Sequence, residues 1–210
     1  MRKFLFPTLI VLLTGLALAF APNKAGEEYV TLEIGENAKL IDREMTSIDG
    51  NNFSLQQLKK AKGLLVIFSC NTCPFVIAWE DRYPELARLA EENEIGFGLI
   101  NSNEAKREGD DSMNEMIDHA KQKGYGELPY LIDKDSELAN AFGAKTTPHV
   151  FLFDKDLKLV YEGAIDDNYK SKDEVSAFYL KDALENLGEG KAIDPNQTKA
   201  LGCSIKRVKI

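Results

Sequence analysis

Two cysteines two residues apart are the part of this chain best suited to chemistry. Cys70 and Cys73 lie in the segment Cys-Asn-Thr-Cys-Pro, after the apolar run 63–69 and before a stretch with helical periodicity. They are therefore predicted at a strand-to-helix turn. The first turn of a helix has unpaired N–H groups and the positive end of the helix dipole, so it stabilises a thiolate. A reactive thiolate with a second thiol about one turn away predicts a redox pair.

Two other interpretations of this pair are a structural disulfide and half of a zinc site. Structural zinc takes four ligands, and the other candidates, Cys203, His119 and His149, stand singly in the sequence. A disulfide that closes so short a loop adds little stability. Redox chemistry is the interpretation that the strand-to-helix context favours.

The N-terminus has the pattern of a secretory signal. Arg2 and Lys3 precede the apolar stretch 4–20, and small residues suit cleavage after Ala19 or Ala21. Residues 1–21 are thus predicted to be a signal peptide, and the protein to be exported to the periplasm or cell envelope. The alternative is an uncleaved leader that anchors the chain in a membrane.

Charge and length limit the possible functions further. The formal net charge is −8, and −10 without Arg2 and Lys3, so nucleic acid is a poor candidate partner. The remaining length fits one domain with its own core, predicted over 22–190, followed by a C-terminal tail over 191–210. Three cysteines are an odd number, so at least one thiol stays free or pairs transiently.

Hydrophobic periodicity and turn residues predict alternating strands and helices. The predicted strands are 40–45, 64–68, 95–100, 128–133, 150–153 and 157–162; the predicted helices are 55–60, 76–93 with a kink at Pro84, 113–123, 136–142 and 175–187. The charged tract 104–111 is expected to be an exposed loop. Strands crossed by helices, then a hairpin and a last helix, predict an α/β fold, a three-layer α/β/α sandwich around a central mixed sheet.

Several segments, taken in order, resemble the thioredoxin-like superfamily and, within it, its redoxin or peroxiredoxin-like branch. They are Phe68 to Val76, Ile100 to Asn103, Leu128 to Leu131, Thr147-Pro148, Phe151 to Asp154, Gly163 to Asn168, and the tail Gly202-Cys203-Ser204-Ile205-Lys206. The resemblance covers the chain from about Tyr29 to the C-terminus. It implies a thioredoxin-like fold.

The resemblance also implies roles for individual residues. Pro148 would be a cis-proline, and Thr147 before it would face the cysteines and offer its backbone to a substrate strand. Cys70, at the strand end and expected to be the more exposed thiol, would attack, and Cys73 would resolve the mixed disulfide. The reverse order stays open, because Cys73-Pro74 also resembles the Cys-Pro dipeptide of peroxiredoxins.

Three further residues are accessory candidates. Glu80 is a possible proton acceptor, although most charged residues on such a helix are simply solvated. His149, next to Pro148, either tunes a thiolate or packs. Cys203 in the tail either reduces or caps the active-site pair, or is an unreactive thiol.

The leading hypothesis is therefore an exported thiol–disulfide oxidoreductase that uses Cys70 and Cys73, without a cofactor or metal. Its expected partners are a protein or small-molecule disulfide and a thiol reductant, with membrane contact only through an uncleaved leader. One alternative is a thiol-dependent peroxidase of peroxiredoxin type. Against this alternative, the chain lacks the arginine with which peroxiredoxins polarise the peroxide O–O bond; Arg82 is a conceivable substitute. A more distant alternative is a copper-binding protein with Cys70, Cys73 and His149 as ligands.

Overall fold

The computed structural model describes residues 29–208. The strands are β1 Met45–Thr46, β2 Asn52–Phe53, β3 Gly63–Ser69, β4 Ile95–Asn101, β5 Tyr130–Ile132, β6 Thr146–Thr147, β7 His149–Asp154, β8 Leu159–Gly163 and β9 Cys203–Ser204. The helices are α1 Leu55–Leu58, α2 Pro74–Trp79, α3 Tyr83–Glu92, α4 Met113–Gln122, α5 Glu137–Phe142 and α6 Tyr179–Gly188. Short 3-10 turns cover Glu80–Arg82, Glu104–Lys106, Lys134–Ser136 and Lys172–Glu174.

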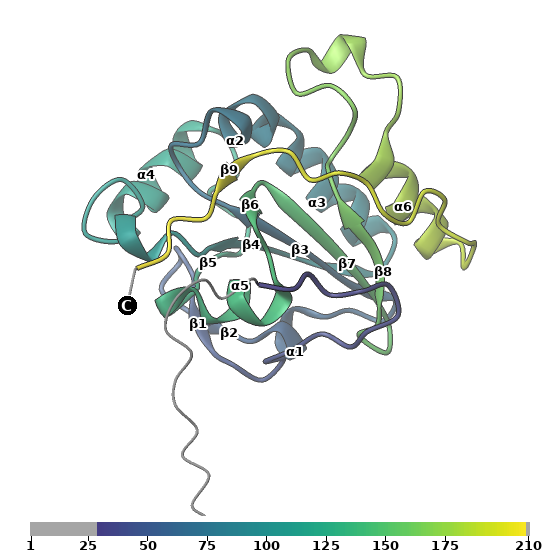
Figure 1. Ribbon diagram of the computed structural model, residues 1–210, viewed down its shortest axis with the longest axis horizontal. Helices are drawn as coiled ribbons and strands as arrows, with labels where there is room; N and C mark the ends of the chain where they lie inside the picture. The colour runs from purple at the N-terminus through teal and green to yellow at the C-terminus, as the bar shows by residue number, and fades with distance from the viewer. Residues whose placement is uncertain (1–28, 209–210) are drawn as a thin grey trace, which may run out of the picture.

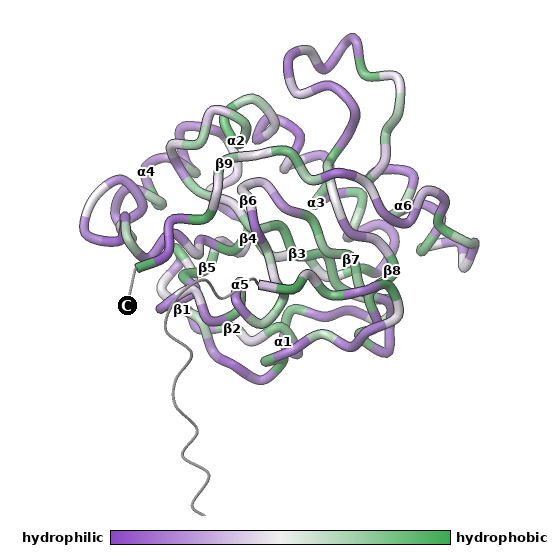
Figure 2. The backbone as a smooth tube through the Cα atoms, viewed as in Figure 1, coloured by the Kyte–Doolittle hydropathy of each residue, from purple (hydrophilic) through white to green (hydrophobic). Residues whose placement is uncertain are grey.

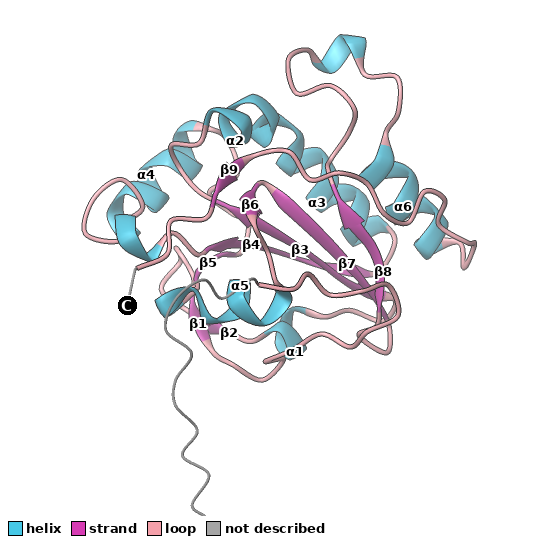
Figure 3. Ribbon diagram, in the orientation of Figure 1, coloured by secondary structure: helices cyan, strands magenta, loops and turns pink. Residues whose placement is uncertain are grey.

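A five-stranded mixed sheet forms the centre of the molecule, in the order β5-β4-β3-β7-β8 (Figures 1 and 3). β3, β4 and β5 run parallel, whereas β7 is antiparallel to β3 and β8 is antiparallel to β7. The predicted α/β architecture is confirmed, including the hairpin of β7 and β8. The sheet places the carboxyl ends of β3 and β4 at one edge, where the cysteines follow β3.

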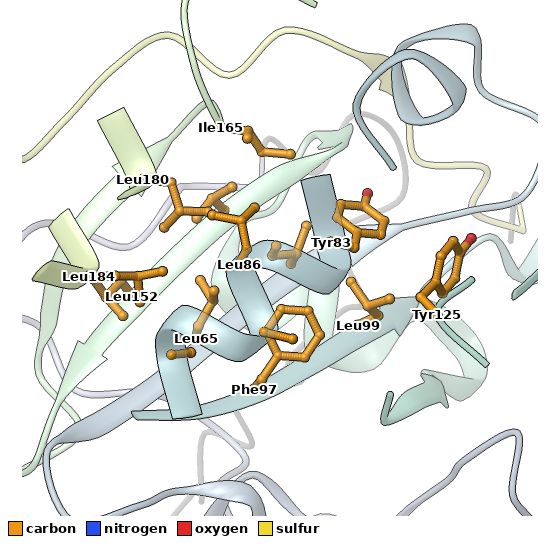
Figure 4. Packing of buried hydrophobic residues seen from close by; sticks show 14 of the residues in the cluster. Leu65, Tyr83, Leu86, Phe97, Leu99, Tyr125, Leu152, Ile165, Leu180 and Leu184 are labelled. Atoms are coloured by element: carbon orange, nitrogen blue, oxygen red, sulfur yellow. The ribbon is translucent and has the colours of Figure 1, made fainter. Parts of the chain in front are cut away.

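Both faces of the sheet are covered, so β3 and β4 are apolar up to their last residues, Ser69 and Asn101. Along β3, Leu65 and Ile67 face one cluster, which includes residues of α3 and α6, while Leu64 and Val66 face another, which includes residues of α1 and α5. Figure 4 shows part of the first cluster, and Figure 2 shows the hydrophobic strands inside a more polar exterior. Every residue of β3 and β4 is buried.

Local signals set several element ends. The side chain of Ser54 accepts from the backbone N–H of Gln57, and the Gln57 side chain accepts from Ser54 N–H, which makes a capping box at α1. The predicted kink near Pro84 appears as a 3-10 turn between α2 and α3. Proline has no N–H for a helical bond, which favours such a break.

Three predictions differ from the structure. The predicted strand 40–45 is a turn and loop up to Glu44, because Leu40 has a φ of 51° and its carbonyl accepts from Arg43 N–H; only Met45 belongs to a strand, β1. The last helix begins at Tyr179 and not at 175, because Asp167 holds the preceding residues away from the helix: its carboxylate accepts from Ser176 N–H at 2.9 Å, and its N–H donates to the Ala177 carbonyl at 3.2 Å. The tract 104–111 is only partly an exposed loop, since Asp111 at its end is fully buried.

The residues after α6 return across the domain. β9 pairs antiparallel with β6 and lies between β6 and α2 (Figure 1). The predicted leader, residues 1–21, lies outside the described residues. Within 29–208, no helix is long and apolar enough to cross a membrane.

Candidate redox site

The two thiols lie at the turn between β3 and α2. Ser69 ends β3, and Cys73 is the residue that caps the N-terminus of α2, with Pro74 at its first turn. Proline suits this position because a residue there needs no N–H for the helix. The predicted strand-to-helix placement is thus confirmed, and Cys73 is the thiol at the helix start.

Thr147 contacts both sulfurs. Its hydroxyl lies 3.2 Å from Cys70 Sγ, and its carbonyl oxygen lies 3.1 Å from Cys73 Sγ, where it can accept a hydrogen bond only while that thiol is protonated. The peptide bond between Thr147 and Pro148 is cis, as the resemblance implied. The structure therefore brings four of the predicted site residues together.

The pKa values of the two thiols are shifted in opposite directions. The hydrogen bond from Cys70, with those from Cys203 and the Val76 N–H, outweighs burial and lowers the pKa of Cys73 to about 4. The same contact with Cys73, burial and the charge of Asp111 raise the pKa of Cys70 well above its ordinary value. These contacts therefore favour the proton on Cys70 and the thiolate on Cys73.

Neither thiol of the pair is open to solvent. Cys70 is 1% exposed and Cys73 is 4% exposed. The expectation that Cys70 is the more accessible thiol is therefore wrong. Phe75, Val76 and Cys203 pack around the pair and cover it.

Cys203 lies beside the pair, on β9. It is opposite Thr147 in the antiparallel register, and its thiol is free and only partly buried. Burial, followed by the hydrogen bond with Cys73 and its charge, raises the pKa of Cys203 to about 11. The structure thus places three cysteines around Thr147.

A buried polar network beneath the thiol turn was not predicted from the sequence. Asp111 is fully buried, and its carboxylate accepts from the amides of Asn101 at 2.8 Å and Asn103 at 3.0 Å. The hydroxyl of Tyr130 donates to Asn71 Oδ1 at 3.1 Å. The available signal was the asparagines that follow the neighbouring strands β3 and β4, since the carboxyl ends of parallel strands meet at one edge.

Glu80 is buried but belongs to a different cluster. Its carboxylate contacts His119 Nε2 at 2.6 Å and Lys123 Nζ at 2.7 Å, and accepts from the Tyr125 hydroxyl at 3.3 Å. Burial raises the pKa of Glu80, but His119 and Lys123 outweigh it and lower the pKa overall. Among residues 29–208, no hydrogen bond joins Glu80 to a cysteine.

His149 is buried against Glu162 on the neighbouring strand. Its Nε2 hydrogen-bonds the Glu162 carboxylate, and its Nδ1 accepts from Lys145 N–H at 3.2 Å. The other Glu162 oxygen accepts from Gln197 of the tail at 3.2 Å. These contacts use both ring nitrogens of His149 and hold the ring away from the sulfurs.

Within the described part of the chain, no group of three or more His, Cys, Asp or Glu side chains is arranged to hold a metal. The copper alternative required Cys70, Cys73 and His149 together. The engagement of His149 with Glu162 removes its third ligand.

The family model described as Redoxin matches residues 33–179. An uncharacterized conserved protein from Geobacillus kaustophilus is 34% identical, with a TM-score of 0.78 over 85% of this chain and 94% of that one. No curated protein matches the chain.

Two solved structures of lower identity share the fold. A peroxidoxin from Mycobacterium tuberculosis has a TM-score of 0.57 at 15% identity, over 76% of this chain and 97% of that one. A secreted disulfide oxidoreductase from the same organism has a TM-score of 0.51 at 16% identity, over 72% and 98%. With a profile match over most of its length and a thioredoxin-like architecture, the chain belongs to the Redoxin family.

Proposed function

We propose that this protein is an exported thiol–disulfide oxidoreductase with Cys73 as the nucleophile and Cys70 as the resolving thiol. The observation that carries the proposal is the contact of both sulfurs with Thr147, next to the cis-proline and at the start of α2. This order reverses the one expected from the sequence. Support for it comes from the helix start, which stabilises a thiolate at Cys73 and not at Cys70.

The chemistry follows from this assignment. The Cys73 thiolate attacks one sulfur of a substrate disulfide, forms a mixed disulfide and expels the other sulfur as a thiolate. The Cys70 thiol then attacks Cys73 Sγ, passes its proton to the departing substrate thiolate and closes the Cys70–Cys73 disulfide. A thiol reductant returns the pair to the dithiol and is itself oxidised.

The Thr147 hydroxyl, which contacts Cys70 Sγ, assists the resolving step. In the reduced pair, the Cys73 contact is the largest cause of the raised pKa of Cys70. That cause disappears when Cys73 enters a mixed disulfide, because the sulfur then carries no charge. The hydroxyl of Thr147, which lowers the pKa of Cys70, stays in place.

A thiol peroxidase is the second candidate, favoured by the Cys73-Pro74 dipeptide and the peroxidoxin neighbour. Its weakness is the lack of a cation to polarise the O–O bond. Arg82, the conceivable substitute, donates to Asp166 at 3.0 Å and to the carbonyls of Ala78 at 2.7 Å and Asn168 at 3.0 Å. These contacts occupy the guanidinium away from the thiols.

Export is part of the proposal. It is supported by the leader-like residues 1–21 and by the secreted oxidoreductase that shares the fold. Outside the cytosol disulfides persist, so a dedicated partner has to set the redox state of the pair.

The test uses dithiobis-nitrobenzoate, a small aromatic disulfide whose released thiolate is coloured. Reduced wild-type protein should release two coloured thiolates rapidly, one from attack and one from resolution. The double variant Cys70→Ser with Cys203→Ser, which has no second thiol near Cys73, should release one rapidly and retain the other as a mixed disulfide on Cys73, visible by mass spectrometry. Rapid release from Cys73→Ser at the wild-type rate would overturn the assignment.

Hydrogen peroxide separates the two candidate functions. An oxidoreductase with no peroxidase role should lose its thiols to peroxide slowly in stopped-flow measurements, at a rate close to that of a free low-pKa thiol. Loss of the Cys73 thiol faster than this by several orders of magnitude would favour the peroxidase.

A further inference from the structure

The strand edge beside Thr147, where an extended substrate would pair, is occupied by the chain's own tail. β9 pairs with β6 in antiparallel register, with Thr147 opposite Cys203 and Thr146 opposite Ser204 (Figure 3). Backbone pairing at an exposed edge is a general mode of peptide recognition. The tail therefore binds Thr147 in the manner expected of an extended substrate.

The fit is close at Gly202, the residue before β9. A Cβ atom at this position would lie 2.2 Å from the Thr147 carbonyl oxygen and 3.2 Å from Pro148 N. Only glycine allows the tail to approach the Thr147–Pro148 bond this closely. The position of β9 against Thr147 and Pro148 thus depends on glycine at position 202.

The tail is anchored beyond β9. Ile205 N–H donates to the Lys145 carbonyl at 3.1 Å, and its side chain is buried in the core. Lys206 N–H donates to Asn103 Oδ1 at 2.8 Å. The Arg207 guanidinium donates to Asn140 Oδ1 at 2.7 Å. These bonds hold Cys203 at one register position.

The same register puts the Cys203 thiol against Cys73. Cys203 packs on the cluster of Cys70, Cys73 and Val76. Phe75, in the first turn of α2, packs on the same cluster. Interactions with Cys73 raise the pKa of Cys203 after burial, and the Phe75 N–H lowers it. Two sulfurs from distant parts of the sequence therefore share one helix start.

We propose that Cys203 is a third redox-active thiol, which forms a disulfide with Cys73 and makes the tail an internal substrate of that cysteine. This inference rests on the proposed function, because it requires Cys73 to be the nucleophile. An outside disulfide then competes with Cys203 and Cys70 for one sulfur.

Once Cys73 is in a mixed disulfide, formation of the Cys73–Cys203 disulfide is a thiol–disulfide exchange and needs no further oxidant. The Cys203 thiol attacks Cys73 Sγ, the substrate sulfur leaves and takes the Cys203 proton, and a Cys73–Cys203 disulfide forms. Cys203 can equally attack Cys73 in the Cys70–Cys73 disulfide, which frees Cys70 as a thiol and conserves the number of disulfides.

The pKa of Cys203 depends on whether Cys73 has already reacted. Burial is the largest cause of the raised pKa of Cys203 and remains, but the next two causes, the hydrogen bond and charge of the Cys73 thiolate, vanish when Cys73 is in a mixed disulfide. The Phe75 N–H and the charge of Lys206, which lower its pKa, remain. Cys203 therefore becomes easier to deprotonate only after Cys73 has reacted.

The test maps disulfides after the reduced full-length protein is treated with oxidised glutathione. In Cys70→Ser, digestion and mass spectrometry should find Cys73 joined to Cys203 within one chain. A Cys70→Ser protein that keeps glutathione on Cys73 and leaves Cys203 as a free thiol would overturn the proposal.

The double variant Cys70→Ser with Cys203→Ser separates this proposal from the function on which it depends. It should retain one glutathione on Cys73, because no internal thiol remains to displace it. If Cys73 takes up no glutathione there, the assignment of Cys73 as nucleophile fails, whatever Cys203 does.

Gly202→Ala tests the docked tail without touching a sulfur. In the Cys70→Ser background it should slow closure of the Cys73–Cys203 disulfide about tenfold, because the new methyl group clashes with Thr147. Gly109→Ala is the matched control, since a Cβ there meets only the Lys106 carbonyl at 3.9 Å. Equal closure rates in the two variants would show that the tail position is irrelevant.

Discussion

The carboxylate of Asp111 accepts a hydrogen bond of 2.8 Å from the backbone N–H of Asn71, inside the thiol turn. This contact joins the loop before α4 to the residue that follows Cys70. It gives a buried N–H a charged acceptor and places a negative charge close enough to raise the pKa of Cys70. One side chain thus holds the turn and adds its charge to the contact with Cys73 and the burial that keep the proton on Cys70.

Asp111→Asn should destabilise the fold and lower the pKa of Cys70. An amide supplies one acceptor oxygen where the carboxylate supplies two, so we expect a loss of about 1–3 kcal/mol in the free energy of unfolding. Urea denaturation and thiol titration measure the two effects. Asp110→Asn is the control, because that side chain contacts Lys106 at the surface. Equal stability of the two variants would contradict the role of Asp111.

The reduced protein should carry a thiolate at neutral pH. The pKa of Cys73, lowered to about 4, lies below that of an unfolded cysteine, about 8.5. The free energy of unfolding should therefore rise with pH across this window, and the Cys73 contribution should be lost as pH falls through about 4. Ultraviolet thiolate absorbance and denaturation at several pH values measure both.

Cys70→Ala should raise the pKa of Cys73, since the hydrogen bond from Cys70 is the largest cause that lowers it. Cys70→Ser retains a donor and should leave the pKa lower than Cys70→Ala does. The pH dependence of Cys73 alkylation measures the difference. Identical profiles for the alanine and serine variants would mean that Cys70 does not stabilise the thiolate by hydrogen bonding.

Thr147→Val should slow the resolving step. It removes the hydroxyl that lies 3.2 Å from Cys70 Sγ and keeps the backbone carbonyl that contacts Cys73. A neutral hydrogen bond contributes about 1 kcal/mol, which corresponds to a rate about fivefold lower. Release of the second coloured thiolate from dithiobis-nitrobenzoate measures this step. Thr147→Ser should behave as wild type, and an equally slow serine variant would argue against the hydroxyl.

His149→Phe should lower stability and leave the thiols unchanged. It removes the buried contact with Glu162, which leaves that carboxylate with Gln197 as its remaining side-chain partner, and we expect a loss of about 1–3 kcal/mol. The Cys73 alkylation profile should match that of wild type. A shift of that profile would show instead that His149 tunes the thiolate.

The thiol turn could be predicted from the sequence because all its determinants are local. The change from an apolar run to helical spacing around Cys70 and Cys73 appears as expected in β3 and α2. The sandwich fold and the final hairpin were also predictable, since alternating elements and short turns leave few topologies.

The arrangement around the sulfurs was decided only by the tertiary structure. Asp111 meets Asn71 from 40 positions away, and Cys203 meets Thr147 through the pairing of β6 with β9. Periodicity and motif spacing describe neighbours along the chain, whereas these contacts depend on where packing brings separate strand ends together. The sequence by itself therefore determined that a dithiol stands at a helix start. Folding decided which sulfur lies at the helix N-terminus, how little of it is exposed, and which third cysteine lies beside it.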